Sequence, residues 1–195
     1  GISHDLRTPL TRLKLQLAMI DQKTISEKMS KDIDEMEKML NDYLRFAKIQ
    51  AQEETSTINL SELFFEIKNK LNAKNFILKN SENIILKGRV SALKRAFENI
   101  IQNGLAYGNN IYVDLQKTSS RVVINFEDDG PGIPGDQYKN VFKPFFRLDK
   151  SRNLNQTGVG LGLAIVEDII NSHGGNIQLA KSKHKGLQVK IFLPF

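Results

Sequence analysis

The start of the chain holds an imidazole beside a carboxylate, with a hydroxyl one helical turn further on. These groups are His4, Asp5 and Thr8 in the run SHDLRTPL. Apolar residues recur from Leu6 to Ile20 at alternating spacings of four and three, which predicts a helix with one apolar face. At about 100° per residue, His4 and Thr8 lie on the opposite face. The pattern therefore predicts an exposed imidazole, hydroxyl and carboxylate presented together.

An isolated surface histidine usually has no function, and that alternative applies to His4. Pro9 argues against it, because a proline inside a helix removes its own N–H bond and frees the carbonyl of Asp5. The resulting bend costs about 3 kcal/mol. A sequence that bears this cost next to His4 favours a functional site there.

A second helix is predicted by apolar residues that recur from Met29 to Ala47. A short turn at residues 21–24 joins the two helices into an antiparallel hairpin, with Thr24 or Ser26 as the cap of the second helix. One hairpin cannot cover both apolar faces, so a homodimer that forms a four-helix bundle is expected. The alternative is a hairpin packed against the rest of its own chain.

The rest of the chain predicts a second domain of mixed helices and strands. Residues 52–57 are polar and lack apolar periodicity, which indicates a linker between a domain at 1–51 and a domain at 58–195. Helices are predicted at 60–71, 90–107 and 159–171, and strands at 76–78, 84–86, 111–115, 122–126, 176–179 and 188–193. Helices interspersed with mostly antiparallel strands predict an α+β sandwich.

Three motifs in this domain suit a phosphate-bearing ligand. Asn99 and Asn103 are four residues apart on one helix face and offer the oxygen ligands that Mg²⁺ prefers, although exposed asparagines without a function would look the same. The run DDGPGIP, residues 128–134, combines glycines that permit close approach with an acid that can accept from an exocyclic amine; a surface turn is the alternative. The run GVGLGL, residues 158–163, opens a helix whose N–H groups could bind phosphate or only allow close packing.

The irregular stretch between the last two motifs, residues 141–157, is long for a loop, which favours a lid. Its aromatic residues, such as Phe142, could anchor it. Arg147, Lys150 or Arg152 could then reach phosphate oxygens.

Composition excludes several classes of protein. Cysteine is absent from the 195 residues, which excludes disulfides and thiolate metal sites and fits a reducing cytoplasm. The net charge is +6, but the lysines are scattered and no basic stripe is interleaved with aromatics, so no nucleic-acid partner is expected. No apolar run is long enough to span a bilayer. The chain opens on Gly1 within a helical pattern, which suggests a piece of a longer protein.

Taken in order, the motifs resemble those of the catalytic core of a bacterial sensor histidine kinase, over essentially all 195 residues. SHDLRTPL is similar to the H box, residues 99–107 to the N box, DDGPGIP to the G1 box, VFKPFFR to the F box and GVGLGLAI to the G2 box. The sequences SHDLRTPLTR and EDDGPGIP are most similar to the corresponding motifs of EnvZ-type osmosensor kinases. The resemblance implies a dimerisation and histidine-phosphotransfer hairpin followed by a Bergerat-fold ATP-binding domain. It also implies an upstream membrane sensor, so that this chain would be the cytoplasmic portion of an inner-membrane protein.

The resemblance assigns roles to individual residues. His4 is implied as the phosphoacceptor, Asp5 as its acid–base partner, and Thr8 as a residue that helps place water for dephosphorylation of the partner. Asn103 and Asn99 are implied to face Mg²⁺, and Asp129 to bind the adenine amine. The other residues implied in ATP binding are Tyr107, Gly130, Gly132, Ile133, Phe142, Arg147, Arg152, Gly158, Val159, Gly160, Leu161 and Gly162.

Two positions depart from the N box of the family, which usually reads N-A-x-basic-Tyr. Ala106 stands where a cation often contacts phosphate, and Gly104 loosens the helix by about 1 kcal/mol relative to alanine. These departures imply weak nucleotide binding or slow autophosphorylation unless Lys143, Arg147 or Arg152 compensates.

The predicted function is ATP-dependent autophosphorylation of His4, followed by transfer to an aspartate of a response-regulator receiver domain. Phosphatase activity on that regulator is also expected. One alternative is a Bergerat-fold ATPase of the gyrase, Hsp90 or MutL kind, which would not need the histidine-bearing hairpin. Another is a degenerate kinase that acts as a binding module or a phosphatase.

Overall fold

The computed structural model describes residues 53–79, 83–148 and 160–195, and fourteen separate residues nearer the N-terminus: 10, 12, 13, 15–17, 26, 27, 29, 30, 33, 34, 36 and 37. The chain divides into two compact units, Gly1–Gln52 and Glu53–Phe195. The sequence-predicted site residues that lie outside the described part are His4, Asp5, Thr8, Arg152, Gly158 and Val159.

Every described residue of the first unit is helical. Leu10, Leu17 and Ile33 form a buried cluster, so the two predicted helices share an apolar contact. Met29 and Met36, which the same spacing places on the apolar face, remain 44% and 50% exposed. One chain therefore buries only part of the predicted apolar faces. Ser26, one of the two expected caps, donates its hydroxyl to the carbonyl of Leu17 at 2.9 Å.

The second unit contains two sheets. The strands are β1 (Ser56–Asn59), β2 (Phe76–Leu78), β3 (Ile85–Gly88), β4 (Ile111–Lys117), β5 (Arg121–Asp128), β6 (Asn176–Lys181) and β7 (Leu187–Pro194). β1 and β3 pair antiparallel as a small separate sheet, with Ser56 opposite Gly88. The large sheet has the order β2-β4-β5-β7-β6, in which β2 runs parallel to β4 and the other pairs are antiparallel.

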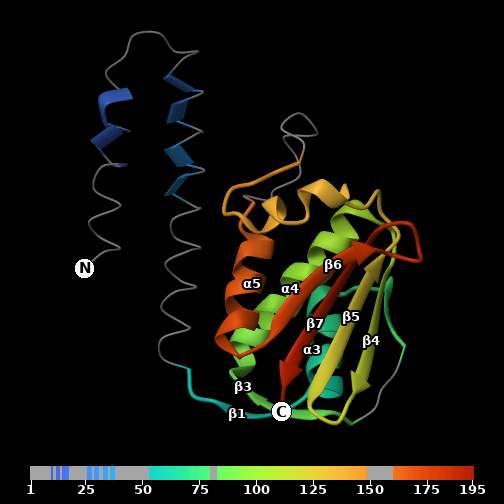
Figure 1. Ribbon diagram of the computed structural model, residues 1–195. Helices are drawn as coiled ribbons and strands as arrows, with labels where there is room; N and C mark the ends of the chain where they lie inside the picture. The colour runs from blue at the N-terminus through green and yellow to red at the C-terminus, as the bar shows by residue number, and fades with distance from the viewer. Residues whose placement is uncertain are drawn as a thin grey trace. The chain divides into compact units, whose positions relative to one another are not determined.

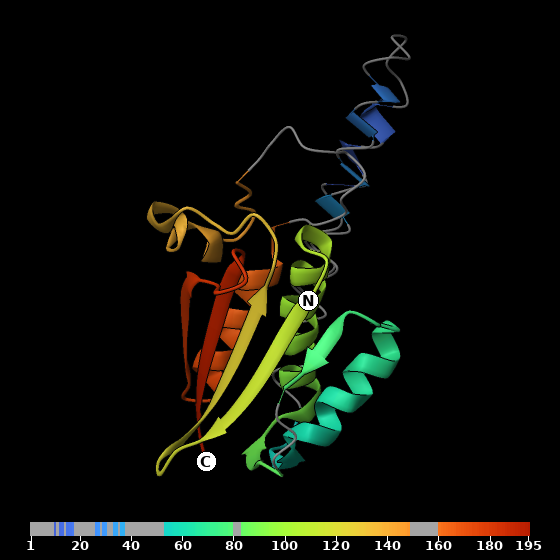
Figure 2. The same cartoon turned by 90° about the vertical axis from the view of Figure 1, so that its right-hand side faces the viewer.

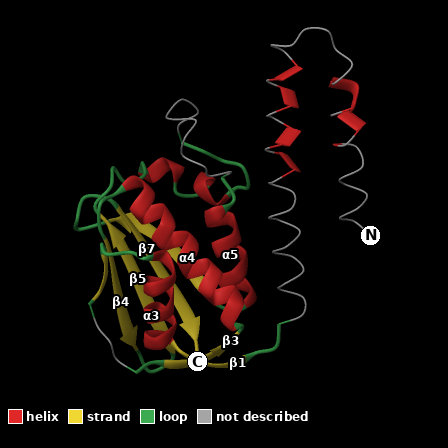
Figure 3. Cartoon of the chain, turned by 180° about the vertical axis from the view of Figure 1, so that it is seen from behind, coloured by secondary structure: helices red, strands yellow, loops and turns green. Residues whose placement is uncertain are grey.

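Three helices cover one face of the large sheet, as Figures 1 and 3 show from opposite sides and Figure 2 shows edge-on. They are α3 (Leu60–Leu71), α4 (Val90–Tyr107) and α5 (Gly162–Ser172). Each helix turns its apolar residues inward, and the core between α3, α4 and β5 is aromatic. The ring of Phe64 stacks on that of Phe97 at 5.0 Å and meets that of Phe126 edge-on at 5.9 Å. This core fixes α4, which carries the paired asparagines, against the sheet.

Several elements differ from the sequence prediction, and strands β4 to β7 each extend one to two residues beyond a predicted end. β1 is an additional strand, and residues 56 and 57 of the expected linker belong to it. The strand expected at 84–86 lies at Ile85–Gly88. The helix expected from residue 159 begins at Gly162 instead, because Gly160 has a φ of 76°, in the left-handed region that a right-handed helix cannot include. The 3₁₀ turns η1 (Gly135–Gln137) and η2 (Asn140–Phe142) were not predicted.

Candidate functional site

The C-terminal end of α4, the C-terminal end of β5 and the N-terminal end of α5 meet at one end of the sheet (Figure 1). The turn after β5 touches the last turn of α4 closely. A Cβ on Gly130 would lie 2.9 Å from the carbonyl oxygen of Tyr107 and 3.0 Å from Asp128 Oδ1. Only glycine fits that contact, so the glycine-rich turn is held against the helix that carries Asn99 and Asn103.

Asp128 is the last residue of β5, and its side chain is buried. Its Oδ1 accepts hydrogen bonds from the backbone N–H of Gly130 at 2.9 Å and of Leu187 at 3.0 Å. Its Oδ2 has no hydrogen-bond partner among the described residues. Burial raises the pKa of Asp128 above its usual value, while the N–H groups of Leu187 and Gly130 act in the opposite direction. Asp128 therefore has one oxygen fixed by the fold and one available to a donor on a ligand.

Asp129, the predicted adenine acceptor, is engaged within the fold. Its Oδ1 accepts from the backbone N–H of Asn109 at 2.7 Å and of Asn110 at 2.9 Å, and its Oδ2 accepts from Asn110 Nδ2 at 2.8 Å. The hydrogen bonds from Asn110 lower the pKa of Asp129, with a smaller contribution from Asn109. Both oxygens thus stabilise the turn between α4 and β4. The geometry favours Asp128 over Asp129 as the acceptor for a ligand.

The sequence contains a signal that could have identified Asp128 as the acid that faces the helices. Ile124, Phe126 and Asp128 alternate along β5, and the first two are fully buried against the helices. The period of two in a strand therefore places Asp128 on the same covered face. Asp129 lies one residue beyond the strand, where this alternation no longer determines its direction.

The two asparagines predicted to face Mg²⁺ lie beside the start of α5. Both are half-buried, and Asn99 Nδ2 lies 3.5 Å from the carbonyl oxygen of Gly162. A Cβ on Gly162 would lie 3.4 Å from Asn103 Nδ2. The amide oxygen of Asn99 and the side chain of Asn103 have no hydrogen-bond partners among the described residues. These oxygens fit Mg²⁺, which prefers hard oxygen ligands and keeps waters and phosphates in its shell.

Gly104, a departure from the family pattern, has a packing role. A Cβ at this position would lie 2.5 Å from Ile111 Cδ1 and 3.5 Å from the Cβ of Asp128. The glycine lets α4 approach the start of β4 and the end of β5. The cost in helix propensity is therefore offset by close packing immediately behind Asp128.

The other predicted residues are distributed around this end of the fold. Gly132 has a φ of 72° and passes close to Gly186, and Ile133 is half-buried. The N–H of Phe145 donates to the carbonyl of Gly160 at 3.0 Å, which brings the flanks of residues 149–159 together. Among the described residues that the resemblance implied, Leu161 is buried, Phe142 and Gly162 are half-buried, and Tyr107 and Arg147 are exposed.

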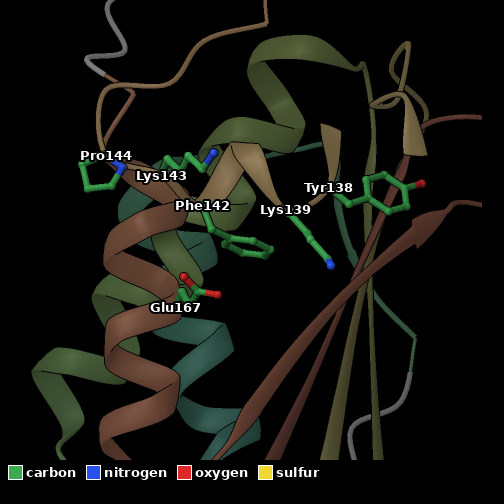
Figure 4. A pocket seen from close by; sticks show the side chains of 6 residues that line it. All are labelled: Tyr138, Lys139, Phe142, Lys143, Pro144 and Glu167. Atoms are coloured by element: carbon green, nitrogen blue, oxygen red, sulfur yellow. The ribbon is translucent and has the colours of Figure 1, made fainter. Parts of the chain in front are cut away.

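A pocket of about 480 Å³ opens between the η1–η2 segment and α5 (Figure 4). Lys139 and Phe142 extend into it from one side and Glu167 from α5 on the other. Burial, followed by the nearby charge of Asp168, raises the pKa of Glu167. Of the residues predicted to bind ATP, this pocket includes only Phe142, so it is separate from the site around Asp128, Asn99 and Asn103. In the part of the chain that the structure describes, no group of three His, Asp or Glu side chains could hold a metal.

Comparison with protein families defines the class of protein. Residues 88–195 match the family described as histidine kinase-, DNA gyrase B- and HSP90-like ATPase, and residues 1–52 match the His Kinase A (phospho-acceptor) domain. The chain therefore belongs to the histidine kinase branch of this ATPase family, as the catalytic core of a sensor histidine kinase. The predicted fold, a helical hairpin followed by an α+β sandwich, is confirmed.

Individual relatives agree. The chain is 32% identical over its whole length to the sensor histidine kinase GtrS of Pseudomonas aeruginosa and 32% identical over 99% of its length to CpxA of Escherichia coli. It spans 41% and 45% of the length of these two proteins, which is less than half.

Solved structures show the same fold. Full-length ShkA in complex with AMPPNP aligns over 100% of this chain and 44% of its own, with a TM-score of 0.69 and 19% identity. The histidine kinase domain of the Escherichia coli osmosensor EnvZ aligns over 73% of this chain and 91% of its own, with a TM-score of 0.55 and 34% identity. A closer relationship to EnvZ-type kinases than to other sensor kinases stays a prediction.

Proposed function

We propose that this chain binds ATP at the junction of α4, β5 and α5 and uses it to phosphorylate His4. The proposal rests on the hydrogen bonding of the Asp128 carboxylate. Two backbone N–H groups hold its Oδ1, which leaves Oδ2 to accept from the exocyclic amine of adenine. We assign this role to Asp128 in place of Asp129. Gly130 and Gly132 line the approach, as the resemblance implies.

The phosphate end of the nucleotide would extend toward Asn99, Asn103 and the start of α5. Bound Mg²⁺ supplies charge neutralisation for the transferred phosphoryl group. The half-buried amides of Asn99 and Asn103 would orient it, and the N–H groups near Gly160, Leu161 and Gly162 would hold phosphate oxygens. Arg147, which is exposed at the edge of residues 149–159, would supply the cation that Ala106 does not.

Transfer requires a neutral His4, which an unperturbed imidazole pKa of about 6.5 allows at neutral pH. Asp5 would hold the Nδ1–H of His4 and leave Nε2 as the nucleophile. The bond from Nε2 to the γ-phosphorus forms as the bond from that phosphorus to the bridging oxygen breaks, and ADP leaves. Asp5 stabilises the positive charge that develops on the ring. Positioning and electrostatics supply most of the rate enhancement.

The phosphoryl group would then pass to an aspartate of a response-regulator receiver domain. Thr8, four residues after His4 in the sequence, would hold the water that later hydrolyses the phosphoaspartate. The hairpin would act as a homodimer, since one chain leaves Met29 and Met36 on its apolar face uncovered. None of the described helices is both long and apolar enough to cross a membrane. We propose that the whole protein is a sensor whose membrane part lies outside this chain, with this part in the cytoplasm.

One labelling experiment distinguishes this function from its alternatives. The chain is incubated with γ-labelled ATP and Mg²⁺, and both the protein and the released phosphate are counted. Acid-labile label on the protein is the expected result. Free phosphate alone would indicate an ATPase of the gyrase or HSP90 kind, and neither product would indicate a binding module.

A further inference from the structure

The first residue of the ATP-binding unit caps the helix that carries the paired asparagines. Glu53 Oε1 accepts from the backbone N–H of Ser91 at 2.6 Å, and its Oε2 accepts from that of Ala92 at 3.1 Å. These two amides are the second and third of α4, which are the donors that a helix cap satisfies. A carboxylate at this position also interacts favourably with the helix dipole.

α4 has no cap of its own. Its N-cap residue, Arg89, makes no side-chain hydrogen bond to the first turn, and that turn contains no acidic residue. The side chain of Arg89 instead donates to Ser172 at the end of α5, and its backbone N–H donates to His173 Nε2 at 3.0 Å. The start of α4 thus depends on a carboxylate that lies 38 residues earlier in the sequence.

The strand register explains how Glu53 reaches α4. β1 pairs with β3 so that Ser56 lies opposite Gly88 and Asn59 opposite Ile85. The chain before Ser56 therefore continues past Gly88 toward the start of α4 at Val90. The contact therefore closes residues 53–55 onto the unit immediately after the boundary at residues 52 and 53.

We propose that Glu53 is a positioning residue for phosphoryl transfer, because its contact with α4 decides whether residues 53–55 are held to the second unit or lengthen its connection to the first. This inference rests on the proposed function. With the contact closed, the second unit begins at Glu53. With it open, residues 53–55 are released and the connection can lengthen by about 10 Å, at roughly 3.3–3.6 Å per residue. The frequency with which ATP bound to one unit meets His4 on the other depends on that length.

The test is the rate of autophosphorylation of the full chain at varied ATP concentration. Glu53→Ala should leave the KM for ATP within twofold, because the amides that Glu53 caps, those of Ser91 and Ala92, precede Asn99 by about two helical turns. The maximal rate should change at least threefold. Glu54→Ala is the matched control, since Glu54 carries the same charge one residue further on but is exposed and has no hydrogen-bond partner among the described residues. It should keep the wild-type KM and maximal rate.

A second variant separates positioning from simple helix capping. Arg89 has the extended conformation of an N-cap, with φ −86° and ψ 111°, so Arg89→Ser supplies a local cap for the same two amides. Glu53→Ala/Arg89→Ser is compared with Arg89→Ser alone, because both lack the contact of Arg89 with Ser172. The double variant should recover thermal stability and keep the altered maximal rate. If the double variant has the same maximal rate as Arg89→Ser, Glu53 acts only as a helix cap and the proposal is wrong. An unaltered maximal rate in Glu53→Ala would also overturn the proposal.

Hydrogen exchange tests the contact between Glu53 and α4 independently of kinase activity. In Glu53→Ala the amides of Ser91 and Ala92 should exchange faster than in the wild type, because they lose the carboxylate that accepts from them. In the double variant these amides should be protected again by the local cap. If they exchange equally fast in the wild type and in Glu53→Ala, the carboxylate does not hold the chain and the proposal is wrong. If exchange behaves as expected but no protein acquires label, the proposed function fails while the contact itself stands.

Discussion

Gly186, in the turn between β6 and β7, is expected to be essential for the nucleotide site although it belongs to none of the predicted motifs. A Cβ added at this position would overlap Asp128 Oδ1 and would also lie 2.5 Å from the carbonyl oxygen of Asp128 and 2.6 Å from the nitrogen of Gly130. Two of these three atoms are backbone and cannot rotate away. Gly186→Ala must therefore displace the end of β5 and the turn after it.

The magnitude follows from these contacts. Overpacking a well-packed region costs about 1–3 kcal/mol. Displacement of Asp128 also weakens its hydrogen bonds to Gly130 and Leu187, which as bonds to a charged group contribute about 1.5–3 kcal/mol each when fully formed. With partial relaxation we expect a loss of roughly 2–4 kcal/mol in the free energy of unfolding. At about 2–4 °C per kcal/mol, this lowers the melting temperature by roughly 5–15 °C.

Thermal melting followed by circular dichroism measures the stability, and titration with a fluorescent ATP analogue below the melting range measures the affinity. Gly135→Ala is the matched control, because a Cβ on Gly135 would meet nothing within 4 Å. We expect Gly186→Ala to melt earlier and to bind the analogue at least tenfold more weakly, and Gly135→Ala to behave as the wild type. If both variants melt within 1 °C of each other and bind equally, the packing around Asp128 has been misread.

Three further predictions concern single side chains. Asp128→Asn should weaken binding of an ATP analogue at least tenfold, because its amide nitrogen would face the adenine amine donor to donor, whereas Asp129→Asn should stay within about threefold; an equal loss in both would contradict the assignment. Thr8→Ala should keep autophosphorylation within a few-fold and strongly slow the decay of phosphorylated regulator, and an unchanged decay would remove Thr8 from the site. Burial lowers the pKa of His173, opposed by its hydrogen bond to the backbone of Ile169, so its contribution to stability is complete above pH of about 6.5 and declines as the pH falls toward the folded-state pKa. His173→Gln should therefore flatten the fall in melting temperature between pH 6.5 and 5, and an unaltered slope would show that another group is responsible.

Helix positions in the second unit could be predicted from sequence because apolar spacing and burial agree there. α3 and α4 have the predicted bounds, since Leu63, Phe64 and Ile67, and Leu93, Phe97 and Ile100, repeat at helical spacing and are all buried. β1 could not be predicted in this way. Its sequence, STIN, has one buried residue, and its order comes from pairing with β3 about 30 residues later. Such a pairing leaves no local pattern.

The motifs of the site could be predicted from the sequence, but the roles of its two neighbouring acids could not be told apart. Asn99, Asn103 and Gly162 were expected from two separate motifs, and the structure places them side by side. The distinction between Asp128 and Asp129 depends on contacts with Leu187 and Asn110, which are distant in sequence. Likewise, the role of Gly186 follows from the approach of the β6–β7 turn to β5, which only the folded sheet defines.

The central claim is that the phosphoryl group of ATP is transferred to His4, and direct labelling of the acceptor tests it. The wild-type chain, His4→Gln and the control His184→Gln are incubated with γ-labelled ATP and Mg²⁺, and acid-labile label on each protein is counted. His184 lies in the turn between β6 and β7, where its ring stacks on that of Tyr112 at 4.0 Å, and it belongs to none of the motifs assigned to transfer. The account predicts label on the wild type and on His184→Gln, and none on His4→Gln with ATP-analogue binding retained. Undiminished acid-labile label on His4→Gln would contradict it.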